Sequence, residues 1–191
     1  MPLVTYGSNY LTGQILIAMP GMPDPRFQKT VIFLCAHNAE GAMGLVLNRQ
    51  FGSITFVDLL EQLEIDSVPV ADLPVHYGGP IDSGRGFVLH STDFMREGSV
   101  LVGDHVALTA TIDILRAIAE GQGPRSALLA LGYSGWGPGQ LDAELISNGW
   151  LNMIPDANLL FDRDIDTKWE RAIAKLGATS LSMLSGEAGH A

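Results

Sequence analysis

The chain has 191 residues, of which 47% are hydrophobic and 17% charged, and 21 acidic residues stand against 11 basic ones, a formal net charge of −10. This apolar content excludes intrinsic disorder, and the length suits a single domain over residues 1–191 that buries its own core. The acidic balance argues against direct binding to nucleic acid, which requires a surplus of Lys and Arg.

The cysteine content and the hydropathy pattern indicate a compartment. The single cysteine, Cys35, excludes an intramolecular disulfide and a zinc site built from several cysteines. The apolar stretch at residues 14–19 is far shorter than the roughly 20 residues that span a bilayer. No basic residue precedes Arg26, whereas a signal peptide begins with basic residues. We therefore expect a cytoplasmic protein that does not insert into a membrane.

The first half of the chain is typical of strands separated by glycine and proline residues. Strands are predicted at residues 13–19, 30–36, 43–47, 75–78, 86–91 and 99–102. The second and third form a hairpin with a loop of four or five residues. Between the third and fourth, Thr55 and Asp58 match a capping box that begins a helix, whose apolar residues recur at helical spacing.

In the second half, helices alternate with strands. Helices are predicted at residues 109–120 and 140–148, and from a second capping box at Thr167 and Glu170 to Gly177. Strands are predicted at residues 126–132 and 150–154, and a last short turn at Leu181 and Leu184. A run of strands followed by this alternation predicts an α+β fold, with helices packed on a mixed, mostly antiparallel sheet.

Residues 132–139 are predicted to form a glycine-rich turn between a buried strand and a helix. A hydrolase places its nucleophilic serine in such a turn. Gly132 precedes Ser134 by two residues as that motif requires, but Trp136 replaces the second glycine. The histidines available to Ser134 are His90, which precedes it, and His190, which is the only one in the position that the α/β-hydrolase order requires but lies next to the last residue of the sequence. A structural turn, with Trp136 covering the core, is the simpler interpretation.

Other polar residues are candidates for binding a ligand. Arg85 lies between two glycines and could bind a carboxylate or phosphate, although a tight turn with an exposed arginine is the favoured interpretation. His90 lies close to Asp93, which is better suited to stabilising a turn than to forming a catalytic triad.

No metal site or cofactor is expected. The acidic run at residues 162–166 departs from a calcium loop, because Thr167 and Ile173 stand where Gly and Glu are required. Cys35 and His37, two residues apart on a strand, share a face but lack a third ligand.

Several segments follow one another in a distinctive order: residues 16–20 with 24–27, 37–49, 77–80 with 85–91, and 132–141, to which 148–151 and 188–191 also fit. Together they resemble the bacterial AlgH family, also called YqgE-like, over essentially the whole chain. The resemblance implies a single α+β domain of the bacterial cytosol and little chemistry. Some members carry a label as transcriptional regulators linked to alginate synthesis.

These observations favour a non-enzymatic regulatory or interaction protein that binds a protein or a small molecule. Any effect on transcription would be indirect, because the chain is acidic and its sequence contains no recognisable helix-turn-helix motif. The alternative is a hydrolase or transferase with a site around Ser134. The candidate ligand-binding residues are Asp24, Arg26, Arg85, His90, Ser134 and Trp136. Convergence of residues 20–26, 78–86 and 133–139 on one pocket would favour a site; the partner and the oligomeric state stay open.

Overall fold

The computed structural model describes residues 10–66 and 68–177. Nine strands form one curled sheet in the order β6-β7-β5-β8-β3-β2-β1-β9, with β4 paired to β8 beside that path. The pair of β4 with β8 is parallel and the other strand pairs are antiparallel. The strands are β1 (Ile15–Ala18), β2 (Val31–Asn38), β3 (Gly41–Val46), β4 (Val75–Tyr77), β5 (Ile81–Ser91), β6 (Ser99–Val102), β7 (Val106–Thr109), β8 (Ala127–Trp136) and β9 (Trp150–Met153).

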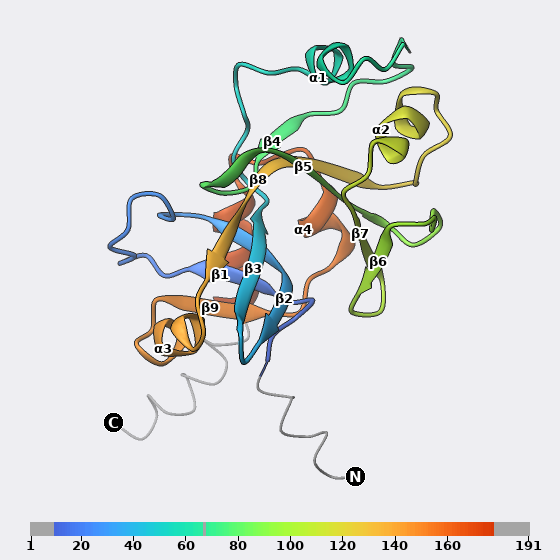
Figure 1. The fold of residues 1–191 in the computed structure, drawn as a ribbon. Coiled ribbons are helices and arrows are strands. Elements are labelled where there is room, and N and C mark those ends of the chain that lie inside the picture. The colour runs from blue at the N-terminus through green and yellow to red at the C-terminus, as the bar shows by residue number, and fades with distance from the viewer. Residues whose placement is uncertain (1–9, 67, 178–191) are drawn as a thin grey trace, which may run out of the picture.

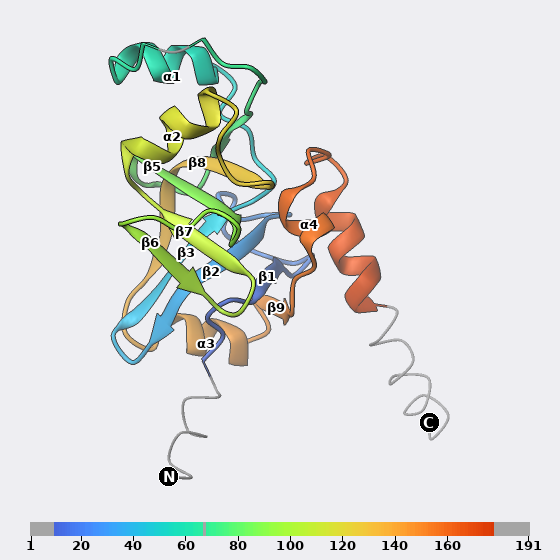
Figure 2. The same ribbon diagram turned by 90° about the vertical axis from the view of Figure 1, so that its right-hand side faces the viewer.

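The helices cover different parts of this sheet (Figures 1 and 2). They are α1 (Phe56–Gln62), α2 (Ile112–Ala119), α3 (Gln140–Ile146), α4 (Ala157–Phe161) and a C-terminal helix that the described residues follow from 168 to 177. In both views α1 and α2 lie at the end of the molecule opposite α3. The α+β class and the mostly antiparallel sheet are therefore confirmed. None of the helices within 10–66 and 68–177 has the length and apolar character needed to cross a membrane.

Alternating side chains along the strands fill three apolar clusters. In β1, Ile15 and Ile17 join an inner cluster that draws on strands from β1 to β8 and on α4, whereas Leu16 and Ala18 face the opposite side. On that outer side, α1 and α2 cover one end of the sheet, and α3 with the β1–β2 loop covers the other. Because both faces are buried, the strands form the continuous apolar runs seen in the sequence.

Several predicted boundaries are wrong. Asn38 pairs with Gly41, so the β2–β3 hairpin has a two-residue loop, which the positive φ of Gly41 (140°) permits. Thr109 ends strand β7, whose partners are β5 and β6, and the helix predicted from Thr109 begins only after Thr111. Helix α4, which Asp156 caps, is absent from the prediction.

Of the two predicted capping boxes, the first forms and the second does not. Thr55 and Asp58 form theirs, with each side chain accepting from the other's backbone nitrogen at 3.1 Å. The hydroxyl of Thr167 instead donates to Asp164 at 2.8 Å, although a helix does begin at residue 168. Gly177 is still helical where the description stops, and the turn predicted at Leu181 and Leu184 lies outside the described residues.

The main correction concerns the glycine-rich segment. β8 continues to Trp136, with Ser134 opposite Gly44 and Trp136 opposite Ala42, so only residues 137–139 turn into α3. These glycines instead allow two backbones to approach closely where the connection between β4 and β5 crosses β8. A Cβ on Gly78 would overlap the carbonyl oxygen of Gly132, and one on Gly79 would overlap the backbone of Tyr133 and Ser134.

This crossing makes Gly79→Ala strongly destabilising. The added methyl has no space against the backbone of β8, so we expect the free energy of unfolding to fall by about 3 kcal/mol or more. Chemical denaturation followed by circular dichroism measures the change. Gly84→Ala is the matched control, because no atom lies within 4 Å of the Cβ it would add; it should change stability by no more than about 0.5 kcal/mol. Equal effects of the two substitutions would contradict the crossing constraint.

Candidate functional site

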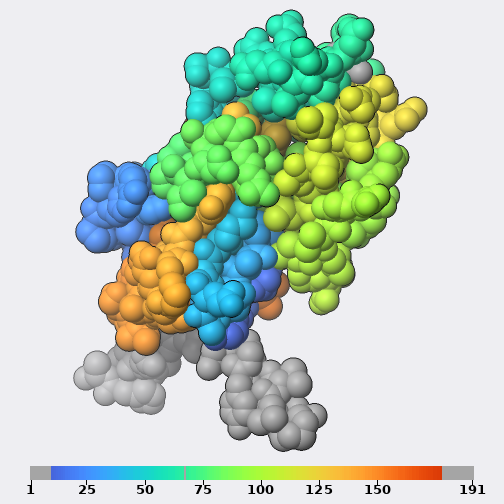
Figure 3. Space-filling model, in the orientation of Figure 1, coloured from blue at the N-terminus to red at the C-terminus, as the bar shows by residue number. Residues whose placement is uncertain are grey.

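A pocket of about 500 Å³ lies between the β1–β2 loop, the start of β5, the end of β8 and α3 with the start of β9. Figure 3 shows a hollow where the lobe formed by this loop meets the start of β5 and the end of β8. Residues 20–26 contribute five side chains or backbone positions to the lining, residues 78–86 contribute Pro80 and Ile81, and residues 133–139 contribute Gly135 and Trp136. The predicted turns therefore converge on one pocket.

The β1–β2 loop owes its shape to an aspartate turn. The Asp24 carboxylate accepts from the backbone nitrogen of Arg26 at 2.9 Å, and the Asp24 carbonyl accepts from the backbone nitrogen of Phe27 at 3.0 Å. The guanidinium of Arg26 folds back onto the same carboxylate, with Nη2 2.8 Å from Oδ2. These hydrogen bonds hold the pKa of Asp24 below its usual value, so its carboxylate is charged at neutral pH.

Two residues that follow β3 clamp this loop. The amide of Asn48 donates to the Lys29 carbonyl at 2.8 Å and accepts from the backbone nitrogen of Val31 at 2.9 Å. The guanidinium of Arg49 donates to the carbonyl of Arg26, and to that of Gln28 at 2.9 Å. The clamp satisfies backbone carbonyls that the irregular loop cannot pair internally, and thereby fixes one wall of the pocket.

The opposite wall is aromatic and is organised by one carboxylate. Glu144, on α3, accepts from the indole nitrogen of Trp136 at 3.0 Å and from that of Trp150 at 2.9 Å, both on Oε1. Its Oε2 accepts from the side chain of Gln140, one helical turn earlier, at 3.0 Å. The Phe27 ring packs against both indoles, with centroids 6.4 Å from Trp136 and 5.8 Å from Trp150.

Of the sequence-predicted site residues, Asp24, Arg26 and Trp136 line this pocket. Ser134 lies one residue from the lining but points away from solvent: it is fully buried, and its hydroxyl donates to the Gly78 carbonyl at 3.2 Å. Its place within a strand, rather than at a sharp turn, differs from that of a hydrolase nucleophile.

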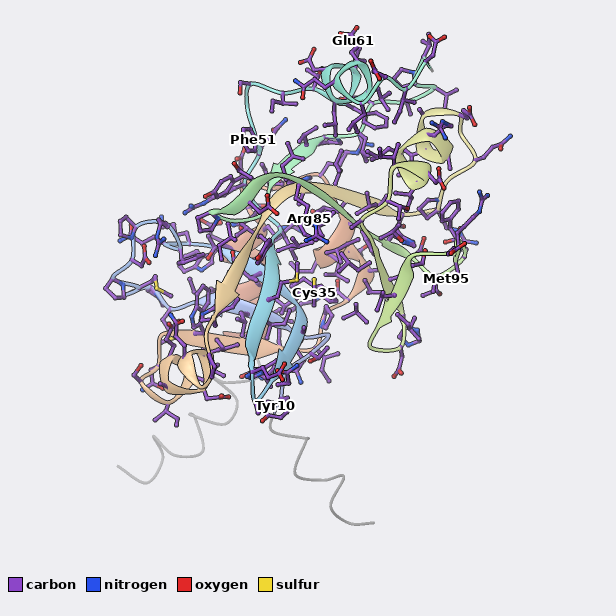
Figure 4. All side chains as sticks on the ribbon, in the orientation of Figure 1. Tyr10, Cys35, Phe51, Glu61, Arg85 and Met95 are labelled. Carbon is purple, nitrogen blue, oxygen red and sulfur yellow. The ribbon has the colours of Figure 1, made fainter. Side chains whose placement is uncertain are left out.

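His90 and Arg85 lie on β5, outside the pocket lining (Figure 4 labels Arg85). His90 is fully buried; its Nδ1 donates to the Ser91 carbonyl at 2.9 Å, so its Nε2 accepts from the Thr109 hydroxyl at 2.7 Å. Burial lowers the pKa of His90, which keeps the ring neutral. Arg85 is exposed and its guanidinium lies over the Phe87 ring. His190 lies outside the described residues.

Glu144, Phe27 and Trp150 are the pocket residues that sequence reasoning missed. The four-residue spacing of Gln140 and Glu144 on a predicted helix was the available signal for Glu144, but it also suits an ordinary solvent-facing pair. Phe27 is more than a hundred positions from the two tryptophans. No local pattern connects residues so far apart, so only the sheet brings them together.

Cys35 and His37 do not face the same side, because a β-bulge between Leu34 and Ala36 inserts an extra residue. Cys35 packs in the inner cluster, where burial raises the pKa of its thiol to about 12 (Figure 4). His37 accepts from the backbone nitrogen of Leu11 and donates to Asp142 of α3, each at 3.0 Å. Over the described ranges 10–66 and 68–177, no cluster of three or more His, Cys, Asp or Glu side chains is arranged to hold a metal ion.

Comparison with known proteins gives consistent matches. A family model described as AlgH-like matches residues 15–180. A UPF0301 protein of Bradyrhizobium diazoefficiens is 53% identical over 199 residues, covering 100% of this chain and 92% of that protein. A UPF0301 protein of Rhodospirillum rubrum is 53% identical over 183 residues, covering 95% of each.

Solved structures agree. The solution structure of the AlgH protein from Pseudomonas aeruginosa matches with a TM-score of 0.75 and 43% identity, covering 94% of this chain and 95% of that one. The crystal structure of protein DIP2367 from Corynebacterium diphtheriae matches with a TM-score of 0.69 over 85% of each chain, and at 16% identity it shows likeness of fold alone.

Outside the pocket, the buried ammonium of Lys168 donates to backbone carbonyls at the C-terminal end of α4. The side chain is fully buried, and Nζ donates to the Asp162 carbonyl at 3.2 Å and lies 3.8 Å from the Asp162 carboxylate. Burial lowers the pKa of this lysine from its usual 10.5 to about 8, against the opposing attraction of Asp162. The sequence pattern, in which Lys168 stands at the start of an amphipathic helix, contains no sign of this burial.

The pKa of Lys168 predicts a pH-dependent stability. The folded chain releases this proton near pH 8 and the unfolded chain near 10.5, so between these values the unfolded state binds more protons and stability rises with pH. Relative to Lys168→Met, the wild type should gain about 2 kcal/mol between pH 7 and about pH 9.5. Urea denaturation of both proteins across this range measures the difference, in which all other titrations cancel. A constant difference would contradict the lowered pKa.

Proposed function

The chain belongs to the AlgH-like family. We propose that it is a cytoplasmic, non-enzymatic binding protein. Its pocket beside the β1–β2 loop would take a small molecule or one side chain of a protein partner. The observation that carries this proposal is the convergence of three distant segments on one cavity of about 500 Å³. A concave site of this volume, with a largely apolar lining and a few polar groups, suits a small ligand.

The construction of the pocket supports binding. Asn48 and Arg49 hold the loop through its backbone carbonyls, and Glu144 holds both indoles by their ring nitrogens. A ligand therefore meets walls that are already ordered, and little conformational entropy is lost when it binds.

The alternative of a hydrolase or transferase at Ser134 has less support. The Ser134 hydroxyl is buried and occupied by the Gly78 carbonyl, and a nucleophile needs both access and a neighbouring base. His90 has partners on both ring nitrogens, Ser91 and Thr109, and neither is Ser134. Non-catalytic binding is therefore the interpretation that leaves the fewest residues unexplained.

We infer that any regulatory role is indirect. A formal net charge of −10 opposes the approach of a nucleic-acid backbone, whose binding depends on cationic side chains. Control of transcription, if this protein exerts it, would pass through the ligand or through a protein that responds to the bound state.

The three tryptophans of the chain provide a direct test of binding. In ¹H–¹⁵N spectra, a chemically diverse set of small fragments should contain members that shift the indole N–H signals of Trp136 and Trp150. Trp169 is the internal control, because it does not line this pocket and packs against the inner cluster instead. Failure of every fragment to shift the first two signals, or equal shifts of all three, would contradict the proposed site.

The enzymatic alternative has its own test. A fluorophosphonate that labels activated serines should leave the wild type unmodified, because the Ser134 hydroxyl is enclosed. Ser134→Ala should behave identically towards the probe and lose about 1 kcal/mol of stability with the hydrogen bond to Gly78. Labelling of the wild type that disappears in this variant would establish Ser134 as a nucleophile and overturn the non-enzymatic proposal.

A further inference from the structure

Glu144 is a carboxylate of the pocket wall that has no counter-ion among the described residues. It accepts three hydrogen bonds, and all three donors are neutral: the indoles of Trp136 and Trp150 and the amide of Gln140. Among the ion pairs of the described residues, none includes Glu144. Within residues 10–66 and 68–177, no cationic side chain therefore pairs with this carboxylate.

The same carboxylate has room for another donor. An ionised carboxylate offers about four acceptor positions, and the three neutral donors use two on Oε1 and one on Oε2. One position on Oε2 is left, in a side chain that lines the cavity. A ligand cation placed there would gain a charge-assisted hydrogen bond, which is about twice as strong as a neutral one.

The rings around Glu144 favour the same kind of ligand. Phe27, Trp136 and Trp150 form one contiguous aromatic surface beside the carboxylate, in which Phe27 is half-buried and the two indoles, 7% and 3% exposed, present their remaining accessible atoms. The faces of such rings attract cations, and tryptophan does so most strongly. Apolar lining from Met19, Met22 and Ile81 would contact an aliphatic stem that carries the charge.

The pocket lining already contains one cation that contacts both a carboxylate and an aromatic ring. Arg26 binds the Asp24 carboxylate through Nε and Nη2, while its guanidinium carbon lies 5.4 Å from the centroid of the Phe27 ring. The chain thus satisfies one of the two pocket carboxylates with its own alkylguanidinium on an aromatic face. The Arg26 side chain is 62% exposed, so a competing cation can reach the same groups.

We propose that the pocket binds a cationic group on an aliphatic stem, an alkylguanidinium or alkylammonium, with the charge on Glu144 and the stem against the aromatic surface. This inference rests on the proposed binding function. The cation has two possible sources, a free small molecule or an Arg or Lys side chain of a partner protein. The recognition chemistry is the same for both.

The experiment compares matched probes that differ in charge. n-Butylguanidinium is the cation, n-butylurea its neutral isostere and pentanoate an anion of similar length, and each is titrated into the wild type while the indole N–H signals are followed. We expect the cation to shift the signals of Trp136 and Trp150 and to bind at least about tenfold more tightly than the urea, with Trp169 unmoved.

Two substitutions should move the cation affinity in opposite directions. Glu144→Gln keeps the shape of the side chain but removes its charge, so cation binding should weaken about tenfold while urea binding changes less than about twofold. Arg26→Met removes a positive charge from the pocket lining and leaves Asp24 without its cation, so the pocket becomes more negative and cation binding should strengthen severalfold. Arg85→Met, an exposed arginine outside the pocket, is the control and should leave both affinities unchanged. If Glu144→Gln folds poorly, the preference of the wild type for butylguanidinium over butylurea still tests the proposal, because equal affinities would refute it.

The possible failures are distinguishable. If urea or pentanoate shifts the two indoles as strongly as the cation, the pocket binds ligands but its preference for a cation is refuted. If none of the three probes and no fragment shifts these signals, the binding function itself fails. A tripeptide with a central arginine, compared with the same peptide containing citrulline, separates the sources: tighter binding than butylguanidinium supports a protein side chain, and weaker binding supports a free small molecule.

Discussion

The close crossing of two backbones is the constraint on which the rest of the structure depends. Gly78 passes β8 so closely that its carbonyl accepts from both the Val46 nitrogen, at 2.9 Å, and the Ser134 hydroxyl, at 3.2 Å. This crossing lets β4 lie between β8 and the segment that follows β3. It also delivers Pro80 and Ile81 to the pocket, beside the end of β8. Glycine at 78, 79 and 132 is the condition for that approach, because any Cβ there would overlap backbone atoms.

One wall of the pocket depends on the connection between the end of β8 and the start of β9. β8 ends at Trp136 and β9 begins at Trp150, and the short helix between them places Glu144 where it reaches both indoles. The Glu144 carboxylate therefore has both a structural role and a role in the proposed function. It orients the two indole rings, and its negative charge determines the kind of ligand that the pocket can bind. Neutral donors stabilise this charge without cancelling it, so a cation still gains from approaching it.

Local patterns predicted most elements, because propensity, capping and apolar periodicity act over a few residues. The capping box of Thr55 and Asp58 is one example, and the strand predicted at residues 30–36 and found at 31–38 is another. The prediction failed where long-range pairing overrides local preference. Residues 132–136 look like a turn by their glycine content, yet β3 provides pairing partners that extend the strand. For the site, the sequence pointed to Asp24, Arg26 and Trp136 but not to Glu144 or Phe27, whose roles depend on contacts between distant segments.

The sequence by itself determined the α+β class, the acidic balance and the family resemblance, because composition and short motifs are properties of the chain whatever its path. Only the tertiary structure decided what the glycine-rich segments do. Whether a glycine permits a catalytic turn or a backbone crossing depends on the atoms that face it, and for Gly79 those atoms belong to Tyr133 and Ser134, more than fifty positions away. The same holds for the charge of Glu144, which becomes significant only where the fold surrounds it with aromatic rings and, within the described part of the chain, pairs it with no cation.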